Sequence, residues 1–259
     1  MAGIQIGRYS LDGSVNGAGP PLLFLHGGDY VAQNAAFLDR LARHWRVTAP
    51  RHPGFGHSER PEGFRTIHDL AYLYLDWLDD QPPGEVVVVG SSLGGWIALE
   101  IAVRSAGRIG RLVLIDALGL KFGGREERDI ADIYALPDDE RQRRTFCEPA
   151  RNSPDYAALG DDELTAIARD RSATALYGWR PYMHDPGLRQ WLHRVRAPSL
   201  VLWGDGDGVV APEYGQKLCA ALPNARFETI ERAGHYPQVE RPDAVADAIE
   251  RFAGMEARR

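Results

Sequence analysis

Cysteine is nearly absent from this sequence. Only Cys147 and Cys219 occur among the 259 residues, and they lie too far apart for a disulfide framework or for the short spacings of metal ligands. A chain of this length buries a sizeable core without such cross-links. We therefore expect no structural metal ion.

Long apolar runs are also missing. The longest aliphatic runs, at 86–89 and 112–115, are far shorter than the roughly 20 residues that span a bilayer. The opening residues, MAGIQIGRYSLDG, contain one arginine and no apolar stretch of signal-peptide length. We expect a cytoplasmic protein with no membrane partner.

Basic residues are not in excess. There are 30 lysines and arginines against 36 acidic residues, a formal net charge of −6, whereas nucleic-acid binders carry a basic surface. The composition, 44% hydrophobic and 25% charged, is that of an ordinary globular protein. We expect a small-molecule substrate and no nucleic-acid partner, and we leave a homodimer open.

Short apolar runs alternate with helical patterns along the chain. Runs that are apolar almost throughout indicate strands covered on both faces, hence a mostly parallel sheet between helices. The segment at 4–17 is more typical of an antiparallel hairpin at the sheet edge. The predicted strands are 20–28, 45–50, 85–90, 111–116, 199–204 and 226–230, and the predicted helices include 67–78, 93–105 and 243–252.

The rhythm breaks between 119 and 196, where no strong strand pattern occurs. This stretch is polar but contains many aromatic residues, so a disordered linker is the weaker alternative. We predict a helical insertion at 119–196 between two parts of one core domain, 1–118 and 197–259.

The segment EVVVVGSSLGGWIALEIA contains the most informative motif. Residues 90–94, Gly-Ser-Ser-Leu-Gly, fit G-x-S-x-G between a strand and a helix, the context of a nucleophile elbow. Flanking glycines permit the tight turn, and Ser92 then stands at a helix N-terminus that favours negative charge. Ser91 has the wrong register, and an ordinary N-cap serine is the alternative for Ser92.

With this motif the sequence resembles the α/β-hydrolase superfamily over nearly its whole length. The segment LHGGD at 25–29 is similar to the family's oxyanion loop. The resemblance implies that the backbone amides of Gly28 and Leu93 form the oxyanion hole, and that His26 braces the loop. Segment 49–58 resembles a second family loop, although Arg51 replaces the usual aspartate; we expect its His52 and His57 to be loop residues.

Two further segments resemble the family's triad loops. Asp207, in WGDGDGVV, matches the position of the acid, and His235, in AGHYP, matches that of the base. Asp205 fits a turn residue better, and Asp116, after the run at 111–116, remains an alternative acid. The order Ser92, Asp207, His235 is the α/β-hydrolase order.

The implied chemistry is acyl transfer to Ser92. His235 would accept the serine proton, Asp207 would orient the imidazole, and water would hydrolyse the acyl-enzyme, with no cofactor. Serine at this position argues against relatives that use aspartate, the haloalkane dehalogenases and epoxide hydrolases. We favour an ester or lactone substrate, and the alternatives are a C–C bond hydrolase of the meta-cleavage-product type and, on the same fold, an acyltransferase, a lyase, a cofactor-free peroxidase or a ligand receptor.

Aromatic residues of the insertion are candidates for the substrate pocket. Their alternative role is packing within the insertion, and Arg180 fits a solvated surface residue better than a carboxylate ligand. Trp96 is expected to pack its helix. The candidate pocket residues are Tyr177, Trp179, Tyr182, Trp191 and, beside the base, Tyr236.

Overall fold

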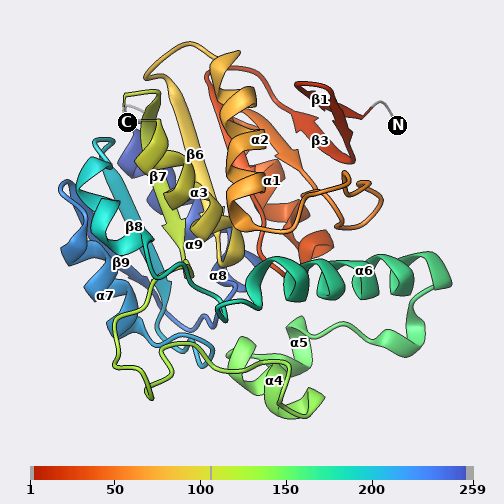
Figure 1. Cartoon of the computed structure of the whole chain (residues 1–259). Helices are drawn as coiled ribbons and strands as arrows, with labels where there is room; N and C mark the ends of the chain where they lie inside the picture. Colours follow the sequence, from red (N-terminus) through yellow and green to blue (C-terminus); the bar gives the residue numbers. More distant parts are fainter. Residues whose placement is uncertain (1–2, 106, 255–259) are drawn as a thin grey trace.

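The computed structural model describes residues 3–105 and 107–254, and a seven-stranded sheet forms its centre (Figure 1). The strand order is β3-β5-β4-β6-β7-β8-β9, and only β3 runs antiparallel to its neighbour. This confirms the predicted fold class. The strands are β3 (Gly13–Asn16), β4 (Pro21–Leu25), β5 (Arg46–Pro50), β6 (Val86–Ser91), β7 (Ile109–Ile115), β8 (Ser199–Gly204) and β9 (Ala225–Ile230).

The N-terminal segment differs from the predicted edge hairpin. β1 (Ile4–Ile6) and β2 (Tyr9–Leu11) pair antiparallel as a separate two-stranded sheet. The following strand, β3, is the one that joins the main sheet, against β5. Gly13 allows this change of direction because its φ is +146°, a value that a residue with a side chain rarely adopts.

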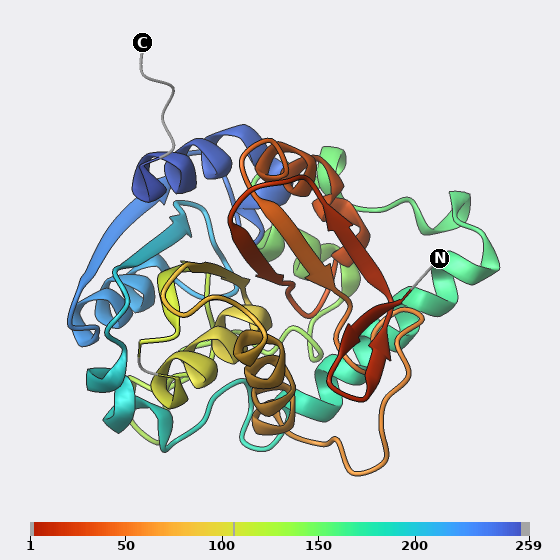
Figure 2. The ribbon, with the colours of Figure 1, turned by 90° about the horizontal axis from the view of Figure 1, so that it is seen from above.

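Helices cover both faces of the sheet (Figure 2). α1 (Ala35–Leu41) and α9 (Pro242–Ala253) pack on the face that holds Phe24 and Val89. α2 (Ile67–Asp79), α3 (Leu93–Arg104) and α7 (Pro212–Ala221) pack on the face that holds Leu25 and Val88. Because adjacent strand residues point to opposite faces and both faces are buried, the central strands β4, β6 and β8 are apolar along most of their length.

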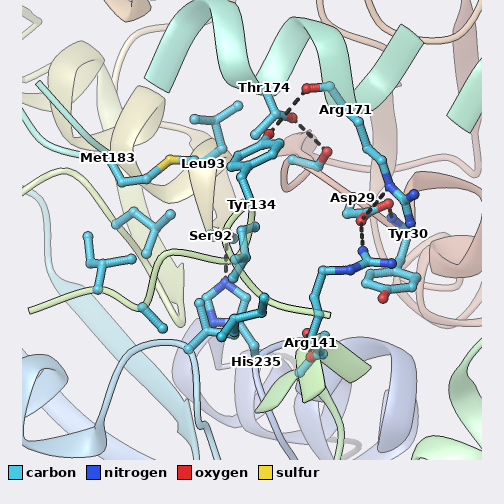
Figure 3. A pocket seen from close by; sticks show the side chains of 18 of the residues that line it. Asp29, Tyr30, Ser92, Leu93, Tyr134, Arg141, Arg171, Thr174, Met183 and His235 are labelled. Carbon is cyan, nitrogen blue, oxygen red and sulfur yellow. Dashed lines mark hydrogen bonds and ion pairs between the residues drawn. The ribbon is translucent and has the colours of Figure 1, made fainter. Parts of the chain in front are cut away.

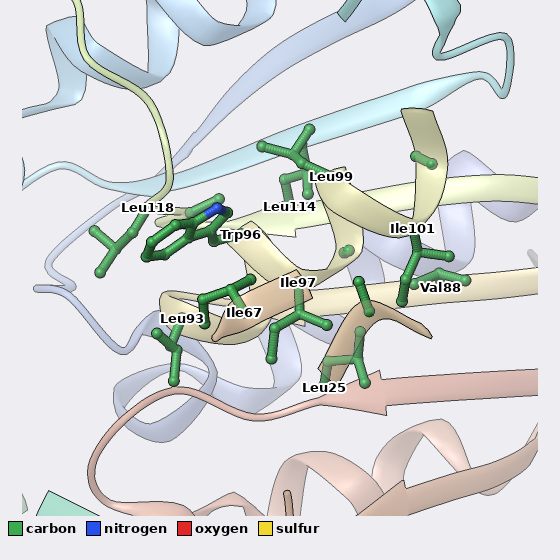
Figure 4. Close-up of a cluster of buried hydrophobic side chains, with 14 of the residues drawn as sticks. Leu25, Ile67, Val88, Leu93, Trp96, Ile97, Leu99, Ile101, Leu114 and Leu118 are labelled. Carbon is green, nitrogen blue, oxygen red and sulfur yellow. The ribbon is translucent and has the colours of Figure 1, made fainter. Parts of the chain in front are cut away.

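The central helix α3 is enclosed along its length. Every residue from Leu93 to Val103 is buried, and Trp96 and Ile97 lie in the apolar cluster of Figure 4. Glu100 is the one acidic residue of this helix; it accepts hydrogen bonds from the Trp96 indole and from Arg104. Trp96 thus packs its helix, as the sequence predicts.

The segment 119–196 lies between β7 and β8, and we call it the inserted segment. Its first part, up to Pro137, contains no helix, so the helical prediction is too broad there. Beyond the carboxyl ends of the strands lie α4 (Asp138–Thr145), α5 (Pro149–Asn152), the 3₁₀ helix η2 (Tyr156–Ala158) and α6 (Asp161–Gly178) (Figure 1). The 3₁₀ helix η3 (Leu188–Arg194) packs instead beside α3, where Arg194 donates to the Val103 carbonyl, at 2.7 Å.

Within the described residues, no helix has the length and apolar character needed to cross a membrane.

We predict that Gly94→Ala destabilises the fold. A Cβ at position 94 would overlap the backbone carbonyl of Leu25, so α3 would have to move away from β4. Such overpacking costs about 1–3 kcal/mol, although alanine favours a helix by about 1 kcal/mol. Calorimetry should show a melting temperature lower by roughly 2–8 °C.

Gly124→Ala is the matched control, because its nearest non-neighbouring atom would lie 3.7 Å from the added carbon. Equal melting temperatures for the two variants would show that the contact between α3 and β4 is looser than described.

Candidate active site

Ser92 occupies a strained turn between β6 and α3. Its φ is +52° and its ψ is −116°, a conformation that costs a residue with a side chain about 1–3 kcal/mol. The turn is held because the Ser92 amide donates to Ile115, at 2.9 Å, and its carbonyl accepts from Gly95, at 3.0 Å. A Cβ on Gly90 would overlap Gly94, so the turn requires glycine there. The Ser92 side chain is thereby fixed at the sheet end.

His235 and Asp207 lie beside this serine. The Ser92 Oγ is 2.8 Å from His235 Nε2 (Figure 3), and His235 Nδ1 is 2.8 Å from Asp207 Oδ2. The other Asp207 oxygen accepts the amides of Val209 and Val210, at 2.8 and 3.0 Å. The structure therefore brings together the three residues predicted from the sequence, in loops that follow β6, β8 and β9.

The two residues whose backbone amides are predicted to form the oxyanion hole border the same space. Gly28 and Leu93 line a cavity together with Ser92. Among the described residues, neither amide donates a hydrogen bond to a protein acceptor. Leu93 is the first residue of α3, where the helix dipole adds positive potential. These amides can bind an oxyanion that forms next to Ser92.

The loop of Gly28 is braced from both sides. On the inserted segment, the Thr174 hydroxyl lies 2.7 Å from the Gly28 carbonyl and 2.8 Å from the Asp170 carbonyl, and it shares its one proton between these two acceptors. On the core side, His26 Nε2 accepts the amide of His52, at 2.9 Å, and His52 Nε2 lies 3.0 Å from the His26 carbonyl. Burial lowers the pKa of His52 to about 4 and holds the pKa of His26 well below its usual value. Both imidazoles are neutral at pH 7. His26 braces the loop, as the resemblance implies, and His52, predicted only as a loop residue, shares this role.

His57, Arg51 and Asp205 lie in loops near the site and do not contact Ser92. His57 is more than half exposed and faces Asp162. Arg51, which replaces the aspartate usual in this loop, forms an ion pair with Asp12 instead, at 3.4 Å. Asp205 accepts the Ala233 amide, at 3.3 Å, and so braces a turn.

The end of α4 holds the loops of Asp207 and His235. The His235 amide donates to the Thr145 carbonyl, at 2.8 Å, and the Gly208 amide donates to the Arg144 carbonyl, at 3.0 Å. Residues from the inserted segment therefore fix the backbone on both sides of the His235–Asp207 contact.

Glu240, on α8 (Pro237–Glu240), ties the base loop to the segment after α4. Its buried carboxylate accepts the Gly234 amide, at 2.6 Å, and the amides of Cys147 and Glu148, at 3.3 and 3.1 Å. The Asn152 side-chain amide donates to it as well, at 3.1 Å, and these four donors offset the cost of burying the charge. The base loop therefore depends on an acidic residue that does not contact Ser92.

A cavity of about 260 Å³ opens over Ser92. In Figure 3, Met183 and Leu93 lie on one side of the serine, and Asp29, Arg141 and Arg171 lie on the other. The apolar wall consists of Leu93, Leu118, Ile130, Ile133, Leu136, Met183 and Val209.

Polar side chains form the opposite wall. Asp29 accepts from Arg141, at 2.8 Å, and lies 3.5 Å from the Arg171 guanidinium. The buried Tyr30 hydroxyl has no hydrogen-bond partner among the described residues, and burial raises the pKa of Tyr30 above its usual value. Sequence reasoning missed this group, because arginines in a polar helix usually indicate a solvated surface.

Only part of the predicted pocket is correct. Tyr182 and Tyr236 line the cavity, but the others do not. Tyr177 is buried and donates to the Pro53 carbonyl, at 3.0 Å, while Trp179 and Trp191 are 48% and 49% exposed. The predicted pocket role is therefore corrected for Tyr177, Trp179 and Trp191. Tyr177 packs against the core, and Trp179 and Trp191 are half exposed at the surface.

A separate groove lies on the other side of the inserted segment. Arg180 lines it together with Trp179 and Tyr177, so this arginine does not reach Ser92. Beside the groove, His68 Nε2 lies 3.0 Å from Asp185 and 3.4 Å from Glu100. The three ligand atoms are close enough to hold a metal ion, but Glu100 already binds Arg104 and Trp96, and His68 and Asp185 pair with each other.

Comparisons with known proteins identify the family of the chain. A model described as the alpha/beta hydrolase family matches residues 22–248. A putative non-heme bromoperoxidase of Mycobacterium tuberculosis is 31% identical, over 92% of this chain and 95% of its own. A 2-hydroxy-6-oxo-2,4-heptadienoate hydrolase of Pseudomonas putida is 28% identical, over 97% and 98%. The crystal structure of a bacterial membrane phospholipase A superimposes with a TM-score of 0.79, at 23% identity, over 98% of this chain and 85% of the other.

We predict that Thr174→Val slows the reaction of Ser92 with a fluorophosphonate, a reagent that labels activated serines. Valine keeps the shape of threonine but leaves the Gly28 carbonyl without its donor. The loop is then held less firmly, and the Gly28 amide loses its fixed position. The labelling rate should fall roughly tenfold, less than the hundredfold or more that removal of a whole oxyanion donor costs.

Thr174→Ser is the control, since serine retains the hydroxyl and should recover most of the rate. Equal rates for the valine and serine variants would contradict a role for this hydrogen bond.

Proposed function

Because the chain belongs to the alpha/beta hydrolase family, we propose that it is a serine hydrolase that cleaves a small carboxylic ester or lactone. The observation that carries the proposal is the chain of two 2.8 Å contacts from Ser92 through His235 to Asp207. A serine hydroxyl becomes nucleophilic when a base within hydrogen-bond distance accepts its proton.

The residues divide the reaction between them. Ser92 attacks the carbonyl carbon of the substrate while His235 Nε2 takes its proton. The amides of Gly28 and Leu93 stabilise the oxyanion, and Asp207 stabilises the imidazolium. His235 then protonates the leaving alkoxide, and the acyl group remains on Ser92. Water, activated by the same imidazole, releases the acid.

The cavity supports a small substrate with two unlike ends. Its volume of about 260 Å³ lies just below the range usual for ligand pockets, roughly 300–1,000 Å³. An apolar group fits against Ile130 and Met183, and a polar group fits toward Tyr30 and Arg141. An ester with a short apolar acyl chain and a polar alcohol, or the reverse arrangement, satisfies both walls.

We expect a short p-nitrophenyl ester to give a stoichiometric burst of p-nitrophenol that Ser92→Ala abolishes. Asp207→Asn should keep the fold but lower kcat by roughly 10⁴-fold, because the asparagine holds the wrong imidazole tautomer. The measurement is stopped-flow absorbance with matched protein concentrations.

Ser91→Ala is the matched control for the burst. Ser91 is a buried neighbour whose hydroxyl accepts from Gln238, at 3.0 Å, so its loss should leave the burst in place. A burst that survives Ser92→Ala would refute the proposal.

A C–C bond hydrolase is the second candidate, and two observations favour it. Relatives include enzymes named as 2-hydroxy-6-oxo-2,4-heptadienoate and 2-hydroxymuconate semialdehyde hydrolases. The arginine wall of the cavity also suits a substrate with a carboxylate, because a guanidinium can bind such a group with two hydrogen bonds. Asp29 occupies both arginines, however, so we rank this reaction second.

Comparing kcat/KM for a short neutral ester and for 2-hydroxy-6-oxo-2,4-heptadienoate separates the two candidates. We expect the ester to be preferred by about tenfold or more, a difference that differential binding readily supplies. A preference for the dienoate would move the assignment to the C–C hydrolase.

For that reaction, Arg141→Met should raise KM for the dienoate. Arg143→Met, on the exposed side of the same helix, should leave it unchanged.

A further inference from the structure

Asp116 is a buried carboxyl group that the proposed mechanism does not use. It follows β7, has a φ of +44° and is fully buried. Its amide donates to Leu202, at 3.0 Å, and its Oδ1 accepts the Gly204 amide, at 3.0 Å. The side chain is therefore fixed between the ends of β7 and β8. Its second oxygen, Oδ2, has no hydrogen-bond partner among the described residues.

This carboxyl group lies next to the proposed triad. One ligand atom each of Asp116, Asp207 and His235 lie within 4.8 Å of one another. Asp207 and, more weakly, Glu240 add negative potential at Asp116. In the described part of the chain, no lysine or arginine pairs with it. Two buried carboxylates at this separation, without a cation between them, repel each other strongly.

Hydrogen-bond accounting points to the same state. Asp207 Oδ1 already accepts two amides, and Oδ2 faces His235. Burying a charged carboxylate oxygen without a hydrogen-bond donor costs free energy. A protonated Asp116 avoids this cost, because its hydroxyl group can donate a hydrogen bond. Burial, and next the charge of Asp207, hold the pKa of Asp116 well above its usual value.

We propose that Asp116 is a neutral carboxylic acid that donates a hydrogen bond to the Asp207 carboxylate and so positions the acid of the triad. The proton stays on Asp116 throughout the reaction. The donor fixes the rotation of the Asp207 side chain and stabilises its negative charge without adding a second charge beside His235. Asp116 is thus a positioning residue that acts through Asp207, and this role rests on the proposed triad.

Infrared spectroscopy tests the protonation directly. The spectrum of the wild type minus that of Asp116→Asn, at pH 7, should contain the carbonyl band of a protonated carboxylic acid. A carboxylate band in its place would overturn the proposal. This readout needs no substrate, so it gives an answer even when the ester-hydrolase assignment fails.

The pH dependence of fluorophosphonate labelling tests the positioning role. In Asp116→Asn the amide can still donate to Asp207 and accept from Gly204, so the acid limb of the profile should keep its midpoint. In Asp116→Leu the donor is lost, Asp207 and His235 become more basic, and the limb should move to higher pH. The labelling rate at pH 7 should fall roughly 10–100-fold, and the asparagine variant should recover most of it.

An ionised Asp116 gives the opposite result. Removing its charge would make the imidazole less basic, so both variants would move the acid limb to lower pH by about one unit or more. That outcome, or limbs that coincide in all three proteins, would refute the donor role. Thermal melting accompanies each measurement. Where the leucine variant does not fold, the asparagine midpoint and the infrared band still decide the question.

Discussion

The tight turn at Ser92 is the constraint on which the rest of the site depends. A strand of four valines leads into it and a fully buried helix leaves it, so the serine backbone cannot relax without unpacking the core. The strained φ is maintained because Gly90 and Gly94 let β6, α3 and β4 approach without side chains between them. The packing of the sheet and helix thereby fixes the position of the Ser92 hydroxyl group. His235 and Asp207 are placed relative to this hydroxyl by the loops after β9 and β8.

The inserted segment completes the site from outside the sheet. Thr174 fixes the loop of Gly28, and the end of α4 fixes the loops of Asp207 and His235 through backbone hydrogen bonds. The same segment supplies much of the cavity wall. A change in the packing of this segment therefore moves the cavity wall and the loops of Gly28, Asp207 and His235 together.

The sequence predicts the parts of this protein that obey strong local rules. Strands buried on both faces must be mostly apolar, and the glycine-flanked turn requires its motif, so the sequence predicts the sheet and the loops that hold Ser92, Asp207 and His235. The pocket was harder to predict, because contacts across the inserted segment have no local pattern. The aromatic side chains of Trp179 and Trp191 suggest pocket residues from the sequence, but both are half exposed. The polar residues Arg141 and Asp29 line the cavity.

Asp116 shows why position along the chain cannot separate two candidate acids. Both Asp116 and Asp207 follow core strands and both are buried near His235. Only the hydrogen bonds distinguish them. Asp207 accepts two backbone amides and lies next to His235 Nδ1, whereas Asp116 accepts one backbone amide and has a second oxygen without a donor. A low-dielectric site tolerates one negative charge opposite an imidazole more easily than two. Asp116 therefore fits the role of a neutral proton donor. As a donor it stabilises the Asp207 carboxylate, and it does not compete with Asp207 for the imidazole of His235.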